Sequence, residues 1–178
     1  MPKFAPVWFA LSLACLAFCA KAENRGDTDF EYWPDADYDL TVPEISDVVG
    51  HAFGEQMSWA SDIEKYFIRL ASFAPDRVRL HYYGESWEGR RLFYLVISSP
   101  QNMEQLERFK DETLSLTRPT ETDLVGAKAI IDRLPVTVCL AYGVHGNEIS
   151  SPEAAMLTAY HLLASRGDPR VADMLSNT

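Results

Sequence analysis

The chain has 178 residues, of which 47% are hydrophobic and 12% aromatic, and its formal net charge is −10. This length and composition predict one globular domain and exclude a disordered chain, which would hold too few apolar residues to form a core. The acidic balance argues against nucleic acid as a partner, because a phosphate backbone binds basic surfaces.

The first 22 residues have the pattern of a secretory signal peptide. Lys3 precedes an apolar run over 4–20, and Ala20-Lys21-Ala22 fits a small-x-small cleavage site. We expect cleavage after Ala22, a secreted or periplasmic product, and no stable membrane insertion after cleavage. An uncleaved anchor is the alternative, because the run is close to the minimum length of a spanning helix. Cleavage leaves 14 basic and 26 acidic residues, a net charge of −12, and one cysteine, which excludes an intrachain disulfide.

Residues 23–56 form an acidic N-terminal arm in front of a domain that we place at 57–178. Acidic side chains are interleaved there with aromatic residues and prolines, which predicts an extended, solvated segment that lies over the domain. Calcium binding is the alternative interpretation of the acidic run. It is disfavoured because the spacing and the glycine of an EF-hand loop are missing.

The middle of the chain alternates between helical and β periodicity. Apolar residues recur at helical spacing near Trp59, where Ser61 and Glu64 have the pattern of a capping box. Two β-rich runs then flank a polar loop with a glycine at each end, which predicts a hairpin. The predicted elements are a helix over 59–70, hairpin strands over 78–83 and 92–98, and helices over 103–114 and about 123–133.

An apolar strand followed by a tight loop is the most informative feature of the chain. Aliphatic and β-branched residues dominate 136–142, which predicts a buried strand with Cys139 as a small core residue. Glycines in the following loop let the backbone turn so that His145 and Glu148 share one pocket. Catalytic zinc takes three ligands of these types plus a water. We interpret His145 and Glu148 as two of three zinc ligands; the alternative is that they only hydrogen-bond the loop.

A helix is predicted directly after this loop. Ser151 has the position of a capping serine, Pro152 that of the first helical residue, and Glu153 that of a first-turn acid. The helix should run to about Ala164, and a shorter one should follow over 168–175. The two candidate ligands therefore sit at a strand-to-helix junction, where open α/β sheets usually bind ligands.

Two motifs resemble those of the zinc carboxypeptidases of the carboxypeptidase A type. The first is Gly84-x-Ser86-x-Glu88-Gly89-Arg90-x-Leu92, which is similar to a hairpin of that family, and the second is His145-Gly-x-Glu148 after a strand. The resemblance implies an α/β fold with a mixed β-sheet flanked by helices. It also implies hydrolysis of C-terminal peptide bonds with one zinc ion, for which His145 and Glu148 are the first two ligands.

The chain departs from the family pattern in two ways. Asn147 stands where the digestive enzymes commonly have an arginine, so one positive contact to substrate is missing or supplied elsewhere. The family's third zinc ligand, its carboxylate-binding arginine, its tyrosine and its general-base glutamate lie in its second half. We expect these beyond Thr178, and hence a fold that is incomplete at its C-terminus. We interpret His51, His81 and His161 as structural or surface histidines.

The sequence therefore predicts a secreted zinc metallocarboxypeptidase, a hydrolase that acts on peptide and protein C-termini. The chain alone is predicted to be inactive with two of three zinc ligands, and to be poorly stable or to aggregate because an incomplete sheet exposes an edge and an apolar face. Two alternatives stay open: a zinc amidohydrolase of the aspartoacylase or desuccinylase kind, which shares the metal motif, and a non-catalytic secreted binding module.

Overall fold

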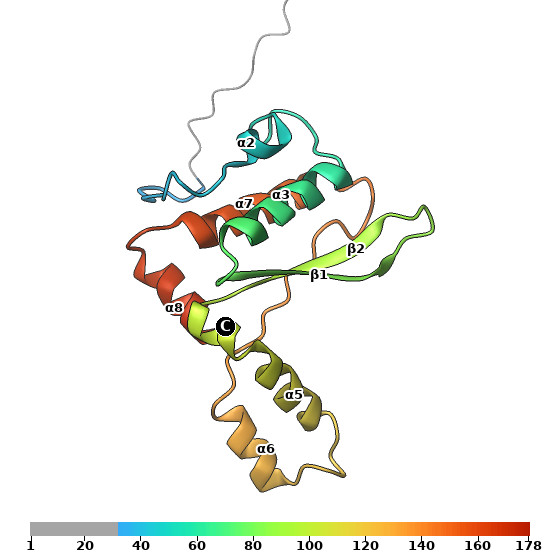
Figure 1. Ribbon diagram of the computed structural model, residues 1–178, viewed down its shortest axis with the longest axis vertical. Coiled ribbons are helices and arrows are strands. Elements are labelled where there is room, and N and C mark those ends of the chain that lie inside the picture. The colour runs from blue at the N-terminus through green and yellow to red at the C-terminus, as the bar shows by residue number, and fades with distance from the viewer. Residues whose placement is uncertain (1–31) are drawn as a thin grey trace, which may run out of the picture. The chain divides into compact units, whose positions relative to one another are not determined.

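The computed structural model describes residues 32–178, so the predicted signal peptide lies outside the described residues. The chain divides into two compact units after Asp35, and the fold below is that of the second unit, Ala36–Thr178. Within it the structure has seven helices and one antiparallel pair of strands, which agrees with the predicted α/β class (Figure 1). Among residues 32–178, no helix combines the length and the apolar character needed to cross a membrane.

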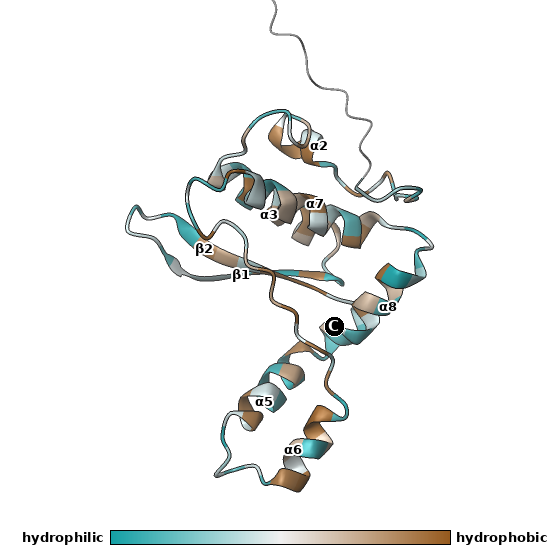
Figure 2. Cartoon of the chain, turned by 180° about the vertical axis from the view of Figure 1, so that it is seen from behind, coloured by the Kyte–Doolittle hydropathy of each residue, from teal (hydrophilic) through white to brown (hydrophobic). Residues whose placement is uncertain are grey.

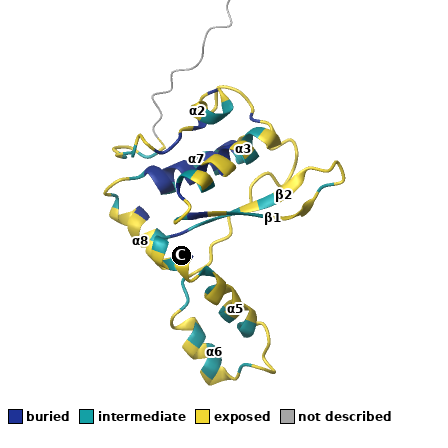
Figure 3. Ribbon diagram, in the orientation of Figure 1, coloured by how far each residue is buried: buried dark blue, intermediate teal, exposed yellow. Residues whose placement is uncertain are grey.

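The hydrophobic core lies where helices α3 (Ala60–Phe73) and α7 (Ser150–Ala164) pack together. The two helices lie side by side in Figure 1, and Figure 3 marks much of α7 as buried. Each helix presents apolar residues at a spacing of three to four, which forms one continuous stripe on its surface. The least exposed side chains of the core, all at or below 2%, are Val42, Tyr66, Leu70, Val78, Met156, Leu163 and Ala164.

The predicted helix over 59–70 is confirmed as α3, but its cap is different. The backbone N–H of Trp59 donates to Oδ2 of Asp62 at 2.9 Å, so Asp62 closes the first turn in place of the Ser61 and Glu64 pair. Either acid satisfies a backbone N–H that has no partner within the helix. Sequence alone does not decide which of two acids two residues apart will do so.

A β-hairpin packs against the core, as predicted. Strand β1 (Val78–Glu85) pairs antiparallel with β2 (Arg91–Ile97), with a bulge between Tyr82 and Gly84. Phe93 of β2 meets Phe67 of α3 edge-to-face, with ring centroids 5.9 Å apart. This contact holds the hairpin on the side of α3 that faces the core.

From Ala36 onward the acidic arm lies over the two core helices, and this part of it is not solvated throughout. Helix α2 (Ile45–Val49) and the residues before it bury Val42 to 2% and Ile45 to 5% exposure, and the Tyr66 hydroxyl donates to the backbone oxygen of Pro43 at 3.0 Å. The apolar side chains between the acids explain the difference, because burying them stabilises the contact with α3 and α7. The arm from Ala36 onward therefore belongs to the same compact unit as the domain.

Four shorter helices complete the described fold, and they match the predictions with small shifts. The predicted helix over 103–114 is divided at Gln105, whose φ of −105° departs from helical values. Helices α5 and α6 bury no residue, and Figure 2 shows α6 as largely hydrophobic and Figure 3 as largely exposed. The helices are α4 (Pro100–Glu104), α5 (Leu106–Leu116), α6 (Leu124–Ile131) and α8 (Pro169–Asn177).

The predicted strand over 136–142 is wrong: the segment is coil, and its apolar side chains are exposed. Cys139, expected in the core, is exposed as well. The residue types do favour a strand, but a strand forms only by hydrogen bonding to a neighbour, and within 32–178 this segment is paired with no strand. Every residue from 136 to 144 is exposed, and the large apolar ones among them are Val136, Val138, Leu140, Tyr142 and Val144.

Acidification is expected to destabilise the fold through His161. The ring is 6% exposed and its Nδ1 lies 3.0 Å from the Tyr38 hydroxyl. Burial lowers the pKa of His161 and outweighs the attraction of the Asp168 carboxylate. The unfolded chain therefore binds the proton more readily, so stability is lost as the pH falls below about 6.5. Urea unfolding at a series of pH values should show this loss of unfolding free energy, and a smaller loss in His161→Gln. An equal dependence of the unfolding free energy on pH in the two proteins would contradict the prediction.

Candidate metal site

His145 and Glu148 lie in direct contact on the loop that leads into α7. Nδ1 of His145 is 2.6 Å from Oε1 of Glu148, and the backbone N–H of Glu148 donates to the His145 oxygen at 3.1 Å. Both side chains reach solvent, with 71% of the His145 side chain and 46% of that of Glu148 exposed. The turn therefore brings the two predicted ligands together at an open surface.

Three hydrogen bonds attach this loop to the first half of α7. The backbone N–H of Gly143 donates to Oγ of Ser151 at 2.8 Å, and that of Ser151 donates to the Glu148 oxygen at 3.3 Å. The Tyr142 hydroxyl lies 3.2 Å from Oγ1 of Thr158, about two helical turns beyond Ser151. Gly143 has a φ of 67°, a value that favours glycine. The loop thus takes its position from a helix whose other face is in the core.

The prediction that Ser151 caps helix α7 is wrong. Helix α7 begins at Ser150 after Ile149, and no side chain caps it. The Ser151 hydroxyl lies inside the first turn and accepts the Gly143 N–H instead, because the returning loop passes over that turn. The hydroxyl that was predicted to cap the helix therefore holds the loop over 143–149 that carries the two predicted ligands, which we call the metal loop.

The donor pair fits a zinc ion in kind and in proximity. An imidazole nitrogen and a carboxylate oxygen are ordinary zinc ligands, and bonds of about 2.0–2.2 Å hold two such atoms roughly 3.4 Å apart in a tetrahedron. Nδ1 of His145 and Oε1 of Glu148 lie 2.6 Å apart on exposed side chains, so one ion could contact both. Within the described residues, no group of three or more His, Cys, Asp and Glu side chains could hold a metal.

The other three histidines have structural contacts, as predicted. His51 is buried with Nε2 3.2 Å from Oγ of Ser58, and His161 is buried beside Tyr38. His81 stacks on Tyr94 across the hairpin, with ring centroids 5.1 Å apart. Each of the three rings therefore contacts a neighbouring side chain.

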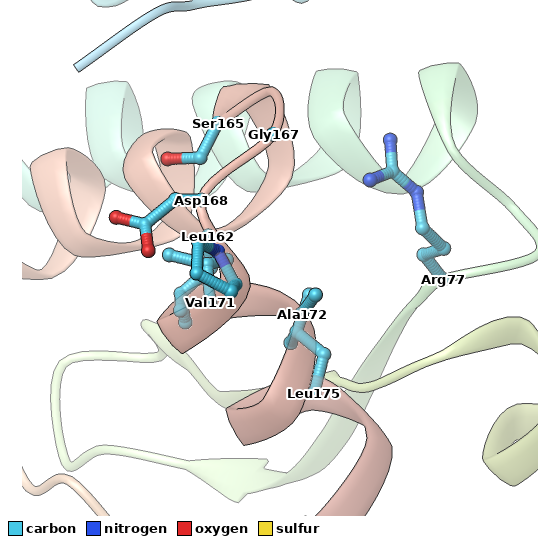
Figure 4. A pocket seen from close by; sticks show the side chains of 9 residues that line it. Arg77, Leu162, Ser165, Gly167, Asp168, Val171, Ala172 and Leu175 are labelled. Carbon is cyan, nitrogen blue, oxygen red and sulfur yellow. The ribbon is translucent and has the colours of Figure 1, made fainter.

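A groove of about 320 Å³ lies at the opposite end of α7 and is separate from the metal loop. Figure 4 shows Arg77 on one side and, on the other, Asp168 before α8 and Leu175 within α8. The Arg77 guanidinium donates to the backbone oxygen of Leu163 at 3.1 Å, and Arg170 holds the pKa of Asp168 down at about 2. Its charged groups are thus engaged with the protein.

Glu153 is a residue of this region that sequence reasoning did not single out. It is 5% exposed, although it was interpreted only as a first-turn acid. Its helical spacing could have indicated burial. Glu153 lies three, seven and ten residues before Met156, Tyr160 and Leu163, which share the buried stripe of α7.

Comparison with known families identifies the family of this chain. The family model for zinc carboxypeptidases matches residues 63–178, which is more than half of the chain and includes both the hairpin and the metal loop. The chain therefore belongs to the zinc carboxypeptidase family. This membership supports a hydrolase function of the zinc peptidase type, with zinc as the metal and peptides as substrates. No curated protein and no solved structure shows a significant match to the chain.

Proposed function

We propose that this chain is part of a secreted zinc metallocarboxypeptidase in which His145 and Glu148 bind the catalytic zinc. The observation that carries the proposal is the 2.6 Å contact between these two side chains, on a loop that is anchored to α7 and lies within the family match. The third ligand and the general base are proposed to come from outside residues 32–178, because catalytic zinc needs three protein ligands.

The residues of this chain contribute to the chemistry by holding and orienting the metal. His145 and Glu148 would hold a zinc ion whose chemistry would be to polarise the scissile carbonyl of a peptide and to lower the pKa of a bound water toward 7. Glu148 contributes a negative charge to the ion and His145 a neutral donor, while the ties of the loop to Ser151 limit how far the two ligands can move apart. Asn147 lies between them on an exposed stretch of the loop and offers an amide in place of a charge.

Activity assays on the naturally produced protein test this proposal. We expect it to release C-terminal residues from peptides with a free carboxylate, to lose this activity after zinc removal by a chelator, and to regain it with added zinc. A panel that includes acylated amino acids separates the amidohydrolase alternative. Cleavage of those alone, or a product that neither binds zinc nor cleaves any member of the panel, would contradict the carboxypeptidase assignment.

A further inference from the structure

Glu153 is a carboxylic acid within an otherwise apolar stripe. The stripe of α7 that includes Met156, Tyr160 and Leu163 is almost fully buried, with exposures between 0% and 8%, and Glu153 continues it with 5%. Burying a carboxylate costs free energy unless hydrogen bonds replace the water that it loses. The position therefore calls for a partner, and the structure supplies one.

That partner is the backbone of a distant segment. Oε1 of Glu153 accepts the backbone N–H of Ser58 at 2.8 Å, across 95 residues of sequence. The Ser58 hydroxyl in turn lies 3.2 Å from Nε2 of His51, whose Nδ1 is 3.1 Å from the backbone oxygen of Ala52. Glu153, Ser58 and His51 are all buried. The three residues form a polar connection between the turn at 51–58 and the first turn of α7.

Stability alone does not explain an acid at this position. Oε2 of Glu153 is also buried, and among the described residues it makes no hydrogen bond. A half-satisfied carboxylate is less favourable than an apolar side chain of similar size, which would extend the stripe of Met156. What the acid provides, and an apolar side chain would not, is a directional link to the Ser58 N–H.

The link acts on the part of α7 that carries the metal loop. Ser151, two residues before Glu153, accepts the Gly143 N–H and donates to the Glu148 oxygen. We propose that Glu153 is a positioning residue: by fixing the first turn of α7 to the turn at 51–58, it holds His145 and Glu148 in the arrangement that binds the metal. This inference rests on the proposed zinc site.

Zinc titrations of the full chain test the role with four variants. Glu153→Ala and Glu153→Asp lose the reach to Ser58, so we expect zinc to bind about tenfold more weakly, at the lower end of the range for residues behind a metal ligand. Glu153→Gln keeps an acceptor oxygen at the same distance and should stay within about threefold of the unmodified chain. Met156→Ala is the matched control, because it removes buried volume from the same stripe and leaves the link intact.

We expect zinc affinity to fall in Glu153→Ala and Glu153→Asp only. Circular dichroism checks that each variant is folded under the conditions of the titration. Unchanged affinity in Glu153→Asp, or an equal loss in Met156→Ala, would overturn the positioning role, and the Asp and Gln pair decides if Glu153→Ala does not fold.

A second readout needs no metal. The ring ¹⁵N signals of His145 report its hydrogen bond to Glu148, and they should move toward those of a free imidazole in Glu153→Asp but not in Glu153→Gln. If these signals respond while His145→Ala leaves zinc affinity unchanged, the zinc site is wrong, and Glu153 then orients the His145–Glu148 pair without serving metal binding. If His145→Ala removes zinc binding while the Glu153 variants alter neither readout, the positioning role is wrong and the zinc site stands.

Discussion

Replacing His145 by alanine is expected to abolish specific zinc binding by this chain. The described residues bring two donors together at the loop, and the substitution leaves one exposed carboxylate, Glu148, which has no second protein ligand to share the ion with. Zinc affinity depends on the number and orientation of its ligands, so the loss should exceed the roughly tenfold effect of a change behind the ligands. Titration of the purified chain against a chromophoric zinc chelator measures it.

His81→Ala is the matched control for this experiment. It removes the same side chain from the hairpin, where His81 stacks on Tyr94 and is no part of the metal loop. We expect the control to bind zinc as the unmodified chain does. The site assignment fails if both alanine variants keep that affinity, and if both lose it the measured binding is adventitious.

The parts of the fold that sequence predicts correctly are those that local interactions decide. Helix α3 has an apolar stripe with Tyr66, Phe67 and Leu70 buried, and this spacing is visible in the sequence without knowing what packs against it. The hairpin is equally local, since β1 and β2 are joined by a short polar loop that returns the chain on itself. The contact between His145 and Glu148 belongs to the same class, because the two residues are three positions apart in one turn.

The errors concern features that depend on distant neighbours. The segment 136–142 has strand composition but remains coil, and Cys139 is exposed, because pairing and covering need partners that the pattern of the segment itself does not specify. The link from Glu153 to Ser58 spans 95 residues, so no local pattern reveals it. The predicted cap at Ser151 failed for a more local reason, since the Ser151 hydroxyl accepts the N–H of Gly143 in the adjacent loop and the helix begins one residue earlier.

The coil before the metal loop bears on how stable this chain is. Its exposed apolar side chains, and separately Leu124, Val125 and Ile131 of α6, contribute little to the free energy of folding, and exposed apolar groups of this kind favour association between copies. The prediction that the isolated chain is poorly stable or aggregates stays open. Because these segments contribute little, the small core between α3, α7 and the hairpin is the main source of stability.

Truncating that core at Leu70 is expected to remove a large part of the stability. Leu70 is 0% exposed and lies in the cluster that includes Tyr66, Val78 and Met156. Leu70→Ala should cost about 2–5 kcal/mol, because the transfer free energy of the deleted atoms is lost and a cavity remains. Single domains have total stabilities of only about 5–15 kcal/mol, so the variant should be partly unfolded under mild conditions. Urea unfolding followed by circular dichroism measures the difference.

A control on the same helix separates the loss of packing from any change in helix propensity. Ile68 is 41% exposed and lies two residues before Leu70, so Ile68→Ala deletes a similar volume from the outer face of α3. Alanine is the better helix former at both positions, which favours the two variants in the same direction. We expect Ile68→Ala to change the free energy of unfolding by less than about 1 kcal/mol. Equal effects at the two positions would show that α3 does not bury Leu70 against α7 and the hairpin, and the core described above would then be wrong.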